Sequence, residues 1–338
     1  MSSRRSFIRR MATLTGALMY RDVFSSSAPP PADQWGTLLP QRALGRTGET
    51  VTMLGVGGFH IGWTTERDAQ EVIETAMAGG IRFFDTAHNY GKGLSEERYG
   101  QFLIPKYRDD IFLMTKSQAA DGAGVLREFD LSRKRMGVDQ VDLLQLHSLK
   151  TPDDVASRIE SGVLDALAQI LESGGARYVG FTGHQSPYAH LEMLKRVSGK
   201  SLFSTLQMPI NPVDGAAEHS FVRQVLPDAV ESGLGVLAMK TLADGRFFSR
   251  KEMNGKVRWQ SEKPVIPTAL SVDDALRFAW SLPISTLITG AENKTLLEEK
   301  IGLARTFSLM SDPEREALLE QVLAVPNCGA VEYYKRIG

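Results

Sequence analysis

Cysteine is almost absent from the sequence: among 338 residues the single thiol is Cys328. One thiol cannot form an intrachain disulfide or a thiolate metal cage, so both are excluded. Long apolar runs are also missing, and none approaches the roughly 20 residues that a membrane-spanning helix needs. Neither charge sign dominates, because 39 basic residues face 40 acidic ones, for a net charge of −1. The chain lacks the basic field that attracts nucleic acid, so we expect neither a nucleic-acid partner nor an integral membrane protein.

The N-terminal residues have the three-part layout that is typical of an export signal. Residues 3–10 are basic, residues 11–20 carry no charge, and residues 25–32 are rich in serine, alanine and proline. The Arg4-Arg5 pair resembles the start of a bacterial twin-arginine signal. We therefore expect a periplasmic or exported protein that uses the twin-arginine export machinery. The alternative is a disordered basic tail on a cytoplasmic protein.

From residue 51 onward, short apolar runs alternate with longer segments of helical pattern. The runs predicted as strands are 51–56, 81–84, 111–114, 141–146, 178–181, 203–206, 235–239 and 285–288. The segments predicted as helices are 65–78, 95–103, 124–136, 160–172, 188–197, 221–232, 271–281 and 296–307. Eight strand–helix units favour an α/β fold of the (β/α)8 TIM-barrel type, in a single domain.

A doubly wound open sheet is the competing fold, since it also alternates strands with helices. Its Gly-x-Gly-x-x-Gly fingerprint fails here, because His60 stands where the third glycine should follow Gly55 and Gly57. No Walker-type phosphate loop is present either. We therefore predict a signal and Pro-rich linker over residues 1–39 and one barrel domain over residues 40–338.

Three further segments lie outside the regular alternation. Residues 40–52 are predicted to form a hairpin, with its turn at residues 45–48, that closes the bottom of the barrel. Residues 244–268 form a long insertion after the seventh strand, on the side where barrel enzymes carry their active sites, and this is the predicted lid or substrate loop. A last amphipathic helix is expected to follow residues 311–313 and end at about Val325.

Four side chains suited to proton transfer fall near the ends of three successive predicted strands. Asp85 ends the second strand, Lys116 the third and His147 the fourth. Tyr90 lies on the loop after Asp85. Neighbouring strand ends in a parallel barrel are about 5 Å apart, so these side chains can converge. Taken singly, each has an ordinary explanation: a capping Asp, a packed Tyr, a Lys that reaches water or a core His.

The chemistry that these four groups support follows from their pKa values. A phenol has a pKa of about 10, and a neighbouring ammonium lowers it. We expect Lys116 to lower the pKa of Tyr90, with Asp85 keeping the ammonium charged and in place. His147 can hydrogen-bond and orient a substrate oxygen, and its protonation state stays open. Such a set protonates a carbonyl oxygen while hydride attacks the carbon. Because no side chain supplies hydride, a nicotinamide cofactor is required.

Four motifs surround these side chains. They are Phe-Asp-Thr-Ala-x-x-Tyr-Gly at residues 84–91, x-Gly-x-Ser-Glu at 92–96, Met-Thr-Lys at 114–116 and Leu-x-x-Leu-His at 143–147. Together they resemble the aldo-keto reductase family, and the likeness covers roughly residues 40–310. The resemblance implies a (β/α)8 barrel that reduces an aldehyde or ketone to an alcohol with NAD(P)H. It also implies that Tyr90 is the general acid, that Lys116 and Asp85 tune it, and that His147 orients the carbonyl.

On the cofactor side the sequence departs from the family pattern. The family usually has Ser-Asn after the fifth strand, holding the nicotinamide carboxamide. Here Thr182 replaces the serine and Gly183 has no amide, so His184 is expected to take over that contact. Gln207 matches a family glutamine that also holds the carboxamide. Met239 stands where a stacking tyrosine is usual, and either covers the ring through its sulfur or fills the core.

Cations and a helix start are expected at the phosphates. Lys240 can reach the pyrophosphate, and Thr289 and Gly290 open the eighth helix, whose N-terminus favours an anion. Lys294 is the nearest cation for an adenosine 2′-phosphate, whereas Lys300 occupies the usual position of an adenine-binding Asn. The residues expected to contact adenine are Glu298 and Glu299. We expect NADPH as the cofactor, with NADH as the alternative.

The substrate is expected to be a small carbonyl compound. Phe59, His60 and Trp63 on the first loop are predicted walls of its pocket, which suggests an apolar or aromatic carbonyl; the competing interpretation is packing under the lid. An alternative function is a nicotinamide-binding sensor or partner protein with little turnover. A hydrolase or isomerase that uses His147 is the weaker third hypothesis, and no metal-ligand spacing supports it, so no metal site is predicted.

Overall fold

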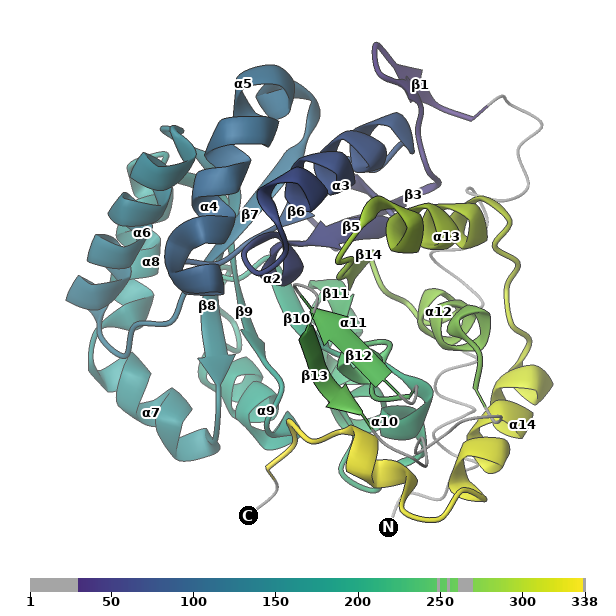
Figure 1. Cartoon of the computed structure of the whole chain (residues 1–338). Helices are drawn as coiled ribbons and strands as arrows, with labels where there is room; N and C mark the ends of the chain where they lie inside the picture. The colour runs from purple at the N-terminus through teal and green to yellow at the C-terminus, as the bar shows by residue number, and fades with distance from the viewer. Residues whose placement is uncertain (1–29, 248–249, 254–255, 261–269, 337–338) are drawn as a thin grey trace.

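Eight parallel strands close into a barrel in the computed structural model, which describes residues 30–247, 250–253, 256–260 and 270–336 (Figure 1). The barrel strands are β5 (Leu54–Gly57), β6 (Phe83–Asp85), β7 (Phe112–Ser117), β8 (Val141–Leu149), β9 (Ala176–Gly183), β10 (Thr205–Pro209), β11 (Gly235–Met239) and β14 (Thr286–Thr289). Each strand pairs in parallel with its neighbours in this order, and β14 pairs with β5 to close the ring. The predicted (β/α)8 fold is confirmed, and the open doubly wound sheet is excluded.

Helices surround the barrel strands (Figure 1). They are α2 (Gly58–Ile61), α3 (Glu66–Ala78), α4 (Leu94–Arg98), α5 (Ile104–Tyr107), α6 (Gly122–Met136), α7 (Pro152–Glu160), α8 (Val163–Glu172), α9 (Pro187–Arg196), α10 (Pro212–Ala216), α11 (Leu226–Glu231), α12 (Val272–Trp280), α13 (Lys294–Arg305) and α14 (Asp312–Leu323). Short 3-10 or π turns are η1 (Tyr90–Gly93), η2 (Tyr99–Leu103), η3 (Arg108–Asp110), η4 (Phe221–Val225), η5 (Ala243–Gly245) and η6 (Cys328–Val331).

Helix starts follow their capping residues, and one of them corrects a prediction. The predicted start of the first helix at Thr65, which is α3 in the structure, is confirmed, because the Thr65 side chain accepts a hydrogen bond from the Asp68 N–H. The single helix predicted over residues 160–172 is wrong at its beginning. A separate helix, α7, precedes it, capped by Thr151 and with Pro152 in its first turn, where a missing N–H costs nothing.

Apolar side chains fill the inside of the barrel, so it is a packed core and not a channel. The interior cluster consists of Leu44, Val51, Phe83, Phe112, Met114, Leu143, Leu237 and Ile288. Leu44 and Val51 come from the hairpin of β3 (Gln41–Ala43) and β4 (Thr50–Thr52), which confirms the predicted hairpin below the barrel. The apolar run 51–56 therefore serves two elements, because it ends β4 and begins β5.

The packed part of the chain begins ahead of the predicted boundary at residue 40. Asp33, in β1 (Ala32–Asp33), forms an ion pair with the buried Arg82 at 2.7 Å. Trp35 Nε1 donates to Asp110 Oδ2 at 2.8 Å, and Leu39 is fully buried. A Pro-rich composition predicted a linker, but β1 and β2 (Gly36–Thr37) form a hairpin held by these long-range contacts. The predicted signal at residues 1–29 lies outside the described residues.

The predicted insertion after β11 contains a second small hairpin. Its strands are β12 (Arg250–Met253) and β13 (Lys256–Gln260), which pair antiparallel. Residues 248–249, 254–255 and 261–269 lie outside the described residues, so the role of the expected lid stays a prediction. Among the helices that the structure describes, none is both long enough and apolar enough to cross a membrane.

Candidate active site

The Asp85 and Lys116 side chains meet at the carboxyl ends of β6 and β7. Lys116 is 1% exposed and Asp85 is 2% exposed. The Lys116 ammonium contacts the Asp85 carboxylate directly, and it donates to the Thr86 carbonyl oxygen at 2.8 Å. Gln207 Nε2, from β10, donates to the other Asp85 oxygen at 3.4 Å. The buried carboxylate is thus a partner both of the predicted ammonium and of a predicted cofactor contact.

Tyr90 and His147 complete the cluster that the sequence predicts. Lys116 Nζ donates to the Tyr90 hydroxyl at 3.3 Å. The Tyr90 ring meets the His147 ring edge to face, with 5.7 Å between the ring centroids. The Phe59 ring meets Tyr90 in the same way at 5.6 Å. All four predicted catalytic side chains therefore lie in one group at the mouth of the barrel.

The proton of Tyr90 is held tightly, which corrects one expectation. Burial raises the pKa of Tyr90 well above 10, and the negative charge of Asp85 raises it further. The expected lowering by Lys116 is not found, because burial and the charge of Asp85 both raise the pKa of the phenol. Burial also raises the pKa of Asp85 and lowers the pKa of Lys116, while the attraction between the two groups opposes both shifts. At neutral pH the phenol is therefore a protonated donor.

His147 is neutral at physiological pH. Burial lowers its pKa well below 6.5, and the positive charge of Lys116 acts in the same direction. His184 and Lys240 add smaller effects of the same sign. Its Nδ1 has no hydrogen-bond partner in the part of the chain that the structure describes. The open question of its protonation state is thereby answered in favour of the neutral imidazole.

Ser95 and Glu96, the Ser-Glu pair of the second motif, hold in place the elements that carry the catalytic side chains. The Ser95 hydroxyl donates to the Gly58 carbonyl oxygen at 2.8 Å, which ties α4 to the start of α2. Glu96 is fully buried; it accepts a hydrogen bond from Thr115 Oγ1 at 2.7 Å and forms an ion pair with Arg135 at 3.1 Å. Thr115 directly precedes Lys116, so this carboxylate fixes the strand that carries the ammonium. The motif was visible in the sequence, but its supporting contacts were not.

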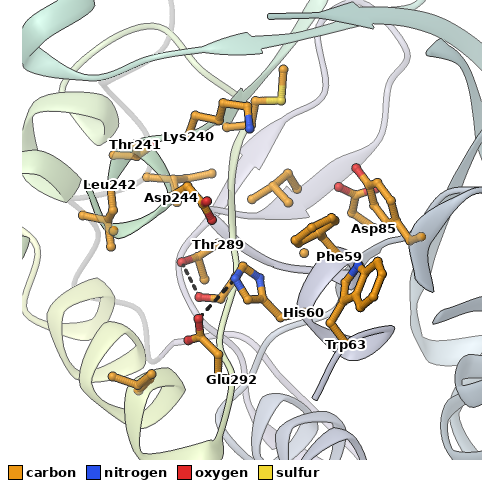
Figure 2. A pocket seen from close by; sticks show the side chains of 18 of the residues that line it. Phe59, His60, Trp63, Asp85, Lys240, Thr241, Leu242, Asp244, Thr289 and Glu292 are labelled. Atoms are coloured by element: carbon orange, nitrogen blue, oxygen red, sulfur yellow. Dashed lines mark hydrogen bonds and ion pairs between the residues drawn. The ribbon is translucent and has the colours of Figure 1, made fainter. Parts of the chain in front are cut away.

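A cavity of about 790 Å³ opens at this end of the barrel. Figure 2 shows Phe59 and Trp63 beside Asp85 on one side, and Lys240, Thr241 and Leu242 on the other. Predicted site residues that line it are Phe59, His60, Trp63, Asp85, Tyr90, His147, His184, Gln207, Met239, Lys240, Thr289, Gly290 and Glu299. Residues in the lining that sequence reasoning missed include Asn89, Ser148, Thr241, Asp244 and Tyr333.

The residues near β9 and β10 fit a nicotinamide carboxamide. Gln207 lines the cavity, and its Oε1 is buried without a hydrogen-bond partner among the described residues, as expected of a group that receives a ligand. Thr182 Oγ1 is also buried and unpartnered among these residues, but Thr182 is not among the residues that line the cavity. A Cβ on Gly183 would lie 2.5 Å from the Leu149 carbonyl oxygen, so the amide-bearing residue usual in the family has no room there. His184 lines the cavity beside this position. The structure therefore gives a physical reason for the glycine.

The predicted helix start at Thr289 and Gly290 is wrong, because Thr289 ends β14 and α13 begins only at Lys294. The predicted cofactor contacts around α13 divide into two groups. Thr289, Gly290 and Glu299 line the cavity, but Glu298 and Lys294 do not. Lys294 is half exposed and forms an ion pair with Glu71 of α3 at 3.5 Å. The buried Lys300 donates to the Gly290 carbonyl oxygen at 2.6 Å, which fixes the loop before the helix.

Phe59 and His60 lie on α2 and not on a loop, and Trp63 follows this helix; the three rings face different parts of the cavity. Phe59 and Trp63 pack together near Tyr90, with 6.1 Å between the Phe59 and Trp63 ring centroids. His60 instead lies 3.4 Å from a carboxylate oxygen of Glu292 (Figure 2). A Cβ on Gly290 would come within 2.0 Å of the His60 ring, so this histidine packs directly on the loop after β14.

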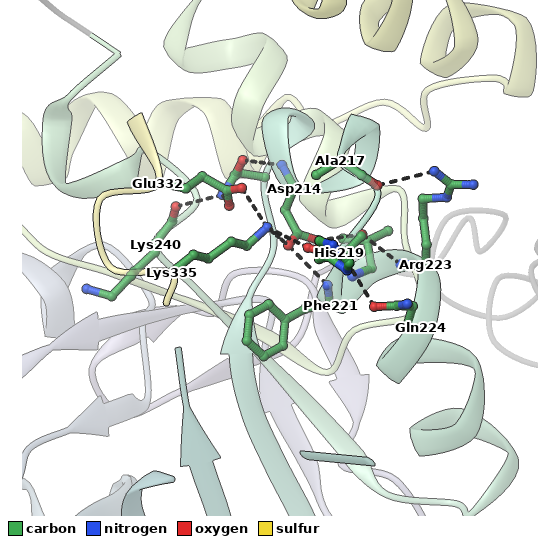
Figure 3. Close-up of polar contacts among 12 residues, drawn as sticks. Asp214, Ala217, His219, Phe221, Arg223, Gln224, Lys240, Glu332 and Lys335 are labelled. Carbon is green, nitrogen blue, oxygen red and sulfur yellow. Dashed lines mark hydrogen bonds and ion pairs between the residues drawn. The ribbon is translucent and has the colours of Figure 1, made fainter. Parts of the chain in front are cut away.

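The C-terminal segment forms a buried network that sequence reasoning missed (Figure 3). Lys335 Nζ lies 2.5 Å from Asp214 Oδ1 and 2.5 Å from Glu332 Oε2. The Tyr334 hydroxyl donates to Glu332 at 2.9 Å, and its ring lies 5.9 Å from that of His184. These contacts hold the chain end against α10 and beside the cavity, where Tyr333 is part of the lining. No local pattern could have paired positions about 120 residues apart.

Replacing Lys335 with methionine should lower the free energy of unfolding by about 3–5 kcal/mol, because two buried carboxylates lose their cation. Urea unfolding gives the free energy, and hydrogen exchange over residues 331–336 reports whether the segment stays docked. A Lys195→Met variant is the control, since Lys195 is 79% exposed and 3.9 Å from Glu192. Equal effects in the two variants would contradict a stabilising role for the buried network.

The stability of the protein should fall as the pH drops from about 7 to 5, because three buried histidines stay neutral. Burial lowers the pKa of His184 to about 3 and that of His190 to about 4, and lowers that of His147 well below 6.5. The unfolded chain binds protons at about pH 6.5, so it takes up as many as about three protons that the folded state does not bind. Stability therefore rises with pH in this window, by at most about 4 kcal/mol per pH unit.

Urea unfolding at pH 5, 6, 7 and 8 measures this slope. A His184→Gln variant should reduce it by about a third, since one of the three imidazoles is removed. A free energy of unfolding that stays flat between pH 5 and 7 would show that these histidines are charged in the folded protein.

A closed parallel barrel with an acid–base cluster at the carboxyl ends of its strands is the arrangement of a (β/α)8 enzyme. Among described residues, no group of three His, Cys, Asp or Glu side chains could hold a metal ion. A family model described as "Aldo/keto reductase family" matches residues 53–299. The chain belongs to the aldo/keto reductase family and is an oxidoreductase of the kind that uses a nicotinamide cofactor.

Named relatives extend over most of the chain. L-galactose dehydrogenase from Arabidopsis thaliana is 27% identical over 317 residues, covering 85% of this chain and 96% of that protein. An uncharacterized oxidoreductase, YrpG, from Bacillus subtilis is 31% identical and covers 86% of this chain and 98% of its own. L-glyceraldehyde 3-phosphate reductase from Escherichia coli K12 is 29% identical over 235 residues, with 63% and 64% coverage.

Solved structures agree on the fold. The holo form of aldo-keto reductase AKR11C1 from Bacillus halodurans superposes with a TM-score of 0.67 at 22% identity, covering 84% of this chain and 96% of that chain. An aldo-keto reductase from Pseudomonas aeruginosa gives a TM-score of 0.61 at 23% identity. At these identities the likeness speaks for the fold alone.

Proposed function

We propose that the protein reduces a small aldehyde or ketone to an alcohol with NAD(P)H, using Tyr90 as the general acid. The observation that carries the proposal is the position of Lys116 Nζ, which contacts the buried Asp85 carboxylate and lies 3.3 Å from the Tyr90 hydroxyl. An ordinary tyrosine at the protein surface has no such partner. Through this contact the Lys116 ammonium stabilises the negative charge that forms on the phenol oxygen after the proton has been transferred.

Each side chain of the catalytic group has a separate role in the proposed reduction. Tyr90 donates its proton to the carbonyl oxygen of the substrate, and the Lys116 ammonium stabilises the phenolate. Asp85 keeps that ammonium in place. Neutral His147 hydrogen-bonds the same carbonyl oxygen and orients it, without competing as an acid, because its pKa lies well below 6.5. Phe59 narrows the access of water to the phenol.

Residues on the other side of the cavity would hold the cofactor, which supplies the hydride when bound. Gln207 Oε1, which has no hydrogen-bond partner among the described residues, would receive its carboxamide, and Thr182 is retained as a second contact. His184 would replace the missing Asn contact. Lys240 and Thr289 line the cavity, and we assign them to the phosphates. We propose NADPH as the preferred form, with NADH as the alternative.

The proposed substrate class is based on the residues that line the cavity and on the substrates for which the relatives are named. Phe59 and Trp63 favour an apolar or aromatic face on the substrate, as the sequence suggested. The polar side chains of Asn89 and Ser148 also line the cavity. L-galactose dehydrogenase, D-threo-aldose 1-dehydrogenase and L-glyceraldehyde 3-phosphate reductase are named for hydroxylated carbonyl substrates. We therefore propose sugars and aldoses, as well as aromatic aldehydes, as candidate substrates.

The test is an absorbance assay with the purified full chain. NADPH or NADH is mixed with aromatic aldehydes, short aliphatic aldehydes and aldoses, and the loss of absorbance of the reduced cofactor is followed. Dissociation constants for both cofactors are measured separately by fluorescence. Carbonyl-dependent oxidation of the cofactor is the expected result. Tight cofactor binding without reduction of any carbonyl would instead favour a nicotinamide-binding sensor, a possibility that the altered positions Gly183 and Lys300 keep open.

We also propose export through the twin-arginine machinery, based on the layout of residues 3–32. That route carries folded proteins, so the cofactor would be bound before export. Fractionation of cells that produce the full chain tests this, together with an Arg4→Lys, Arg5→Lys variant. Periplasmic protein that disappears in the variant is expected, and cytoplasmic protein in both cases would reject export.

A further inference from the structure

His147 is carried by an irregular, strained end of β8. The strand pairs with β9 in regular register up to Leu146, and the register shifts between Leu146 and Leu149. Ser148, inside this bulge, has a φ of 59°. That left-handed conformation is rare for residues other than glycine and persists only where neighbouring groups impose it. Something must therefore hold the bulge that aims the imidazole into the cavity.

The guanidinium of Arg158 holds this bulge. Arg158 lies on α7 and is 3% exposed. Its Nη1 donates to the His147 carbonyl oxygen at 3.0 Å, and its Nη2 donates to that of Ser148 at 3.4 Å. Nη1 also lies 3.5 Å from the carbonyl oxygen of Ala119, on the loop after β7. One side chain thus joins both residues of the bulge to the neighbouring loop.

Asp154 holds the guanidinium in turn. Its carboxylate forms an ion pair with Arg158 Nε at 3.0 Å, one helical turn away on α7. The same carboxylate accepts a hydrogen bond from the Lys150 N–H at 3.0 Å, at the end of the chain segment that leaves β8. The planar fork of an arginine suits this task, because its donors have a fixed geometry that a lysine cannot reproduce.

We propose that Arg158 is a positioning residue for the reaction: it fixes the backbone of His147 and Ser148 and thereby fixes the imidazole against Tyr90. The proposal rests on the proposed function in assigning His147 to the carbonyl oxygen. The positive charge of Arg158 also acts on His147, by helping to keep the imidazole neutral. The groups whose charges bear on His147 are Lys116, His184, Arg158 and Lys240, and with burial as the main cause they keep its pKa low.

The kinetic test compares Arg158→Met, Arg158→Lys and His147→Ala with the double variant His147→Ala/Arg158→Met. We expect Arg158→Met to lower kcat by about 10- to 100-fold, because a shift of about 1 Å in a reacting group has effects of this size. Cofactor affinity should stay unchanged, and Arg158→Lys should recover part of the loss. In the His147→Ala background the second substitution should add nothing. Losses that multiply would overturn the proposal, because Arg158 would then act independently of the imidazole.

A second readout does not depend on turnover. The His147 ring is followed by 15N-resolved NMR between pH 5 and 8. The wild-type ring should not titrate, whereas in Arg158→Met its pKa should move up towards 6.5 and its signals should shift. Asp154→Asn retains the arginine but loses its anchor, so it should give a smaller change of the same kind and is informative if Arg158→Met does not fold.

A ring spectrum that stays the same while the melting temperature falls would mean that Arg158 is merely structural, and the proposal would be wrong. If Tyr90→Phe keeps full turnover, the proposed function fails. The NMR result would still decide whether Arg158 positions the imidazole, so the two failures can be told apart.

Discussion

Turnover of a Tyr90→Phe variant should fall by about 10²- to 10⁴-fold, the range that removal of a general acid or base usually produces. The substitution deletes one oxygen atom and keeps the ring that packs against Phe59 and His147. His147 cannot replace the lost donor as an acid, because its pKa lies far below neutral pH. Steady-state kinetics measure the loss, and fluorescence titration should show that cofactor affinity is retained.

Tyr188→Phe is the matched control. This substitution also removes one phenolic hydroxyl group, which forms a hydrogen bond with His219 at 2.7 Å. Tyr188 is not among the residues that line the cavity. Its turnover should stay close to that of the wild type. Unchanged turnover in Tyr90→Phe itself would remove Tyr90 from the mechanism and with it the central step of the proposed reaction.

Lys116→Met should have the second largest effect, because it removes both a charge from the reaction and a partner from a buried anion. Turnover should fall to a similar extent as in Tyr90→Phe, since nothing then stabilises the phenolate. The free energy of unfolding at pH 7 should fall by about 3–5 kcal/mol, as is usual when one member of a buried ion pair is lost. Urea unfolding and steady-state kinetics measure the two effects separately.

The pH dependence of this loss has a definite sign. Without Lys116, burial remains the main influence on Asp85 and raises its pKa, opposed only by the weaker effect of the Gln207 hydrogen bond. A carboxyl group with a raised pKa in the folded state stabilises the protein at low pH, and that stability is lost as the pH rises through the folded pKa. The defect of Lys116→Met should therefore be smaller at pH 5 than at pH 8.

A second substitution separates folding from catalysis. Asp85→Asn in the Lys116→Met background removes the uncompensated charge, so most of the stability should return. Turnover should stay low, because the ammonium beside Tyr90 is still missing. Recovery of both properties together would mean that Lys116 matters for the fold alone.

The position of the catalytic group could be predicted from the sequence because it depends on local pattern and barrel geometry. Asp85, Lys116 and His147 each follow a short apolar run, and parallel closure brings successive strand ends together. The electrostatic outcome could not be predicted in the same way. The pKa of Tyr90 depends on how completely Asp85 compensates Lys116 and on how deeply the group is buried, and neither quantity is visible in a motif.

Contacts between distant segments account for the other differences. Asp33 belongs to a stretch whose composition suggested a linker, yet it pairs with Arg82, 49 residues further along the chain. Lys335 pairs with Asp214, which no spacing rule connects to it. The start of α7 did carry a signal, Thr151 followed by Pro152, but that signal says nothing of the two carbonyl groups that Arg158 reaches from the same helix.

The hairpin of β1 and β2 has a practical consequence for handling the protein. It packs at Gly80 and Asp110, before β6 and β7 begin, whereas the catalytic group lies where those strands end. A tag or support fused directly ahead of residue 30 would thus be attached at the end of the barrel opposite to the catalytic side chains. Immobilisation through that end should leave the entrance open to diffusing molecules, whereas coupling through the carboxyl terminus would burden the segment that contributes Tyr333 to the wall of the cavity.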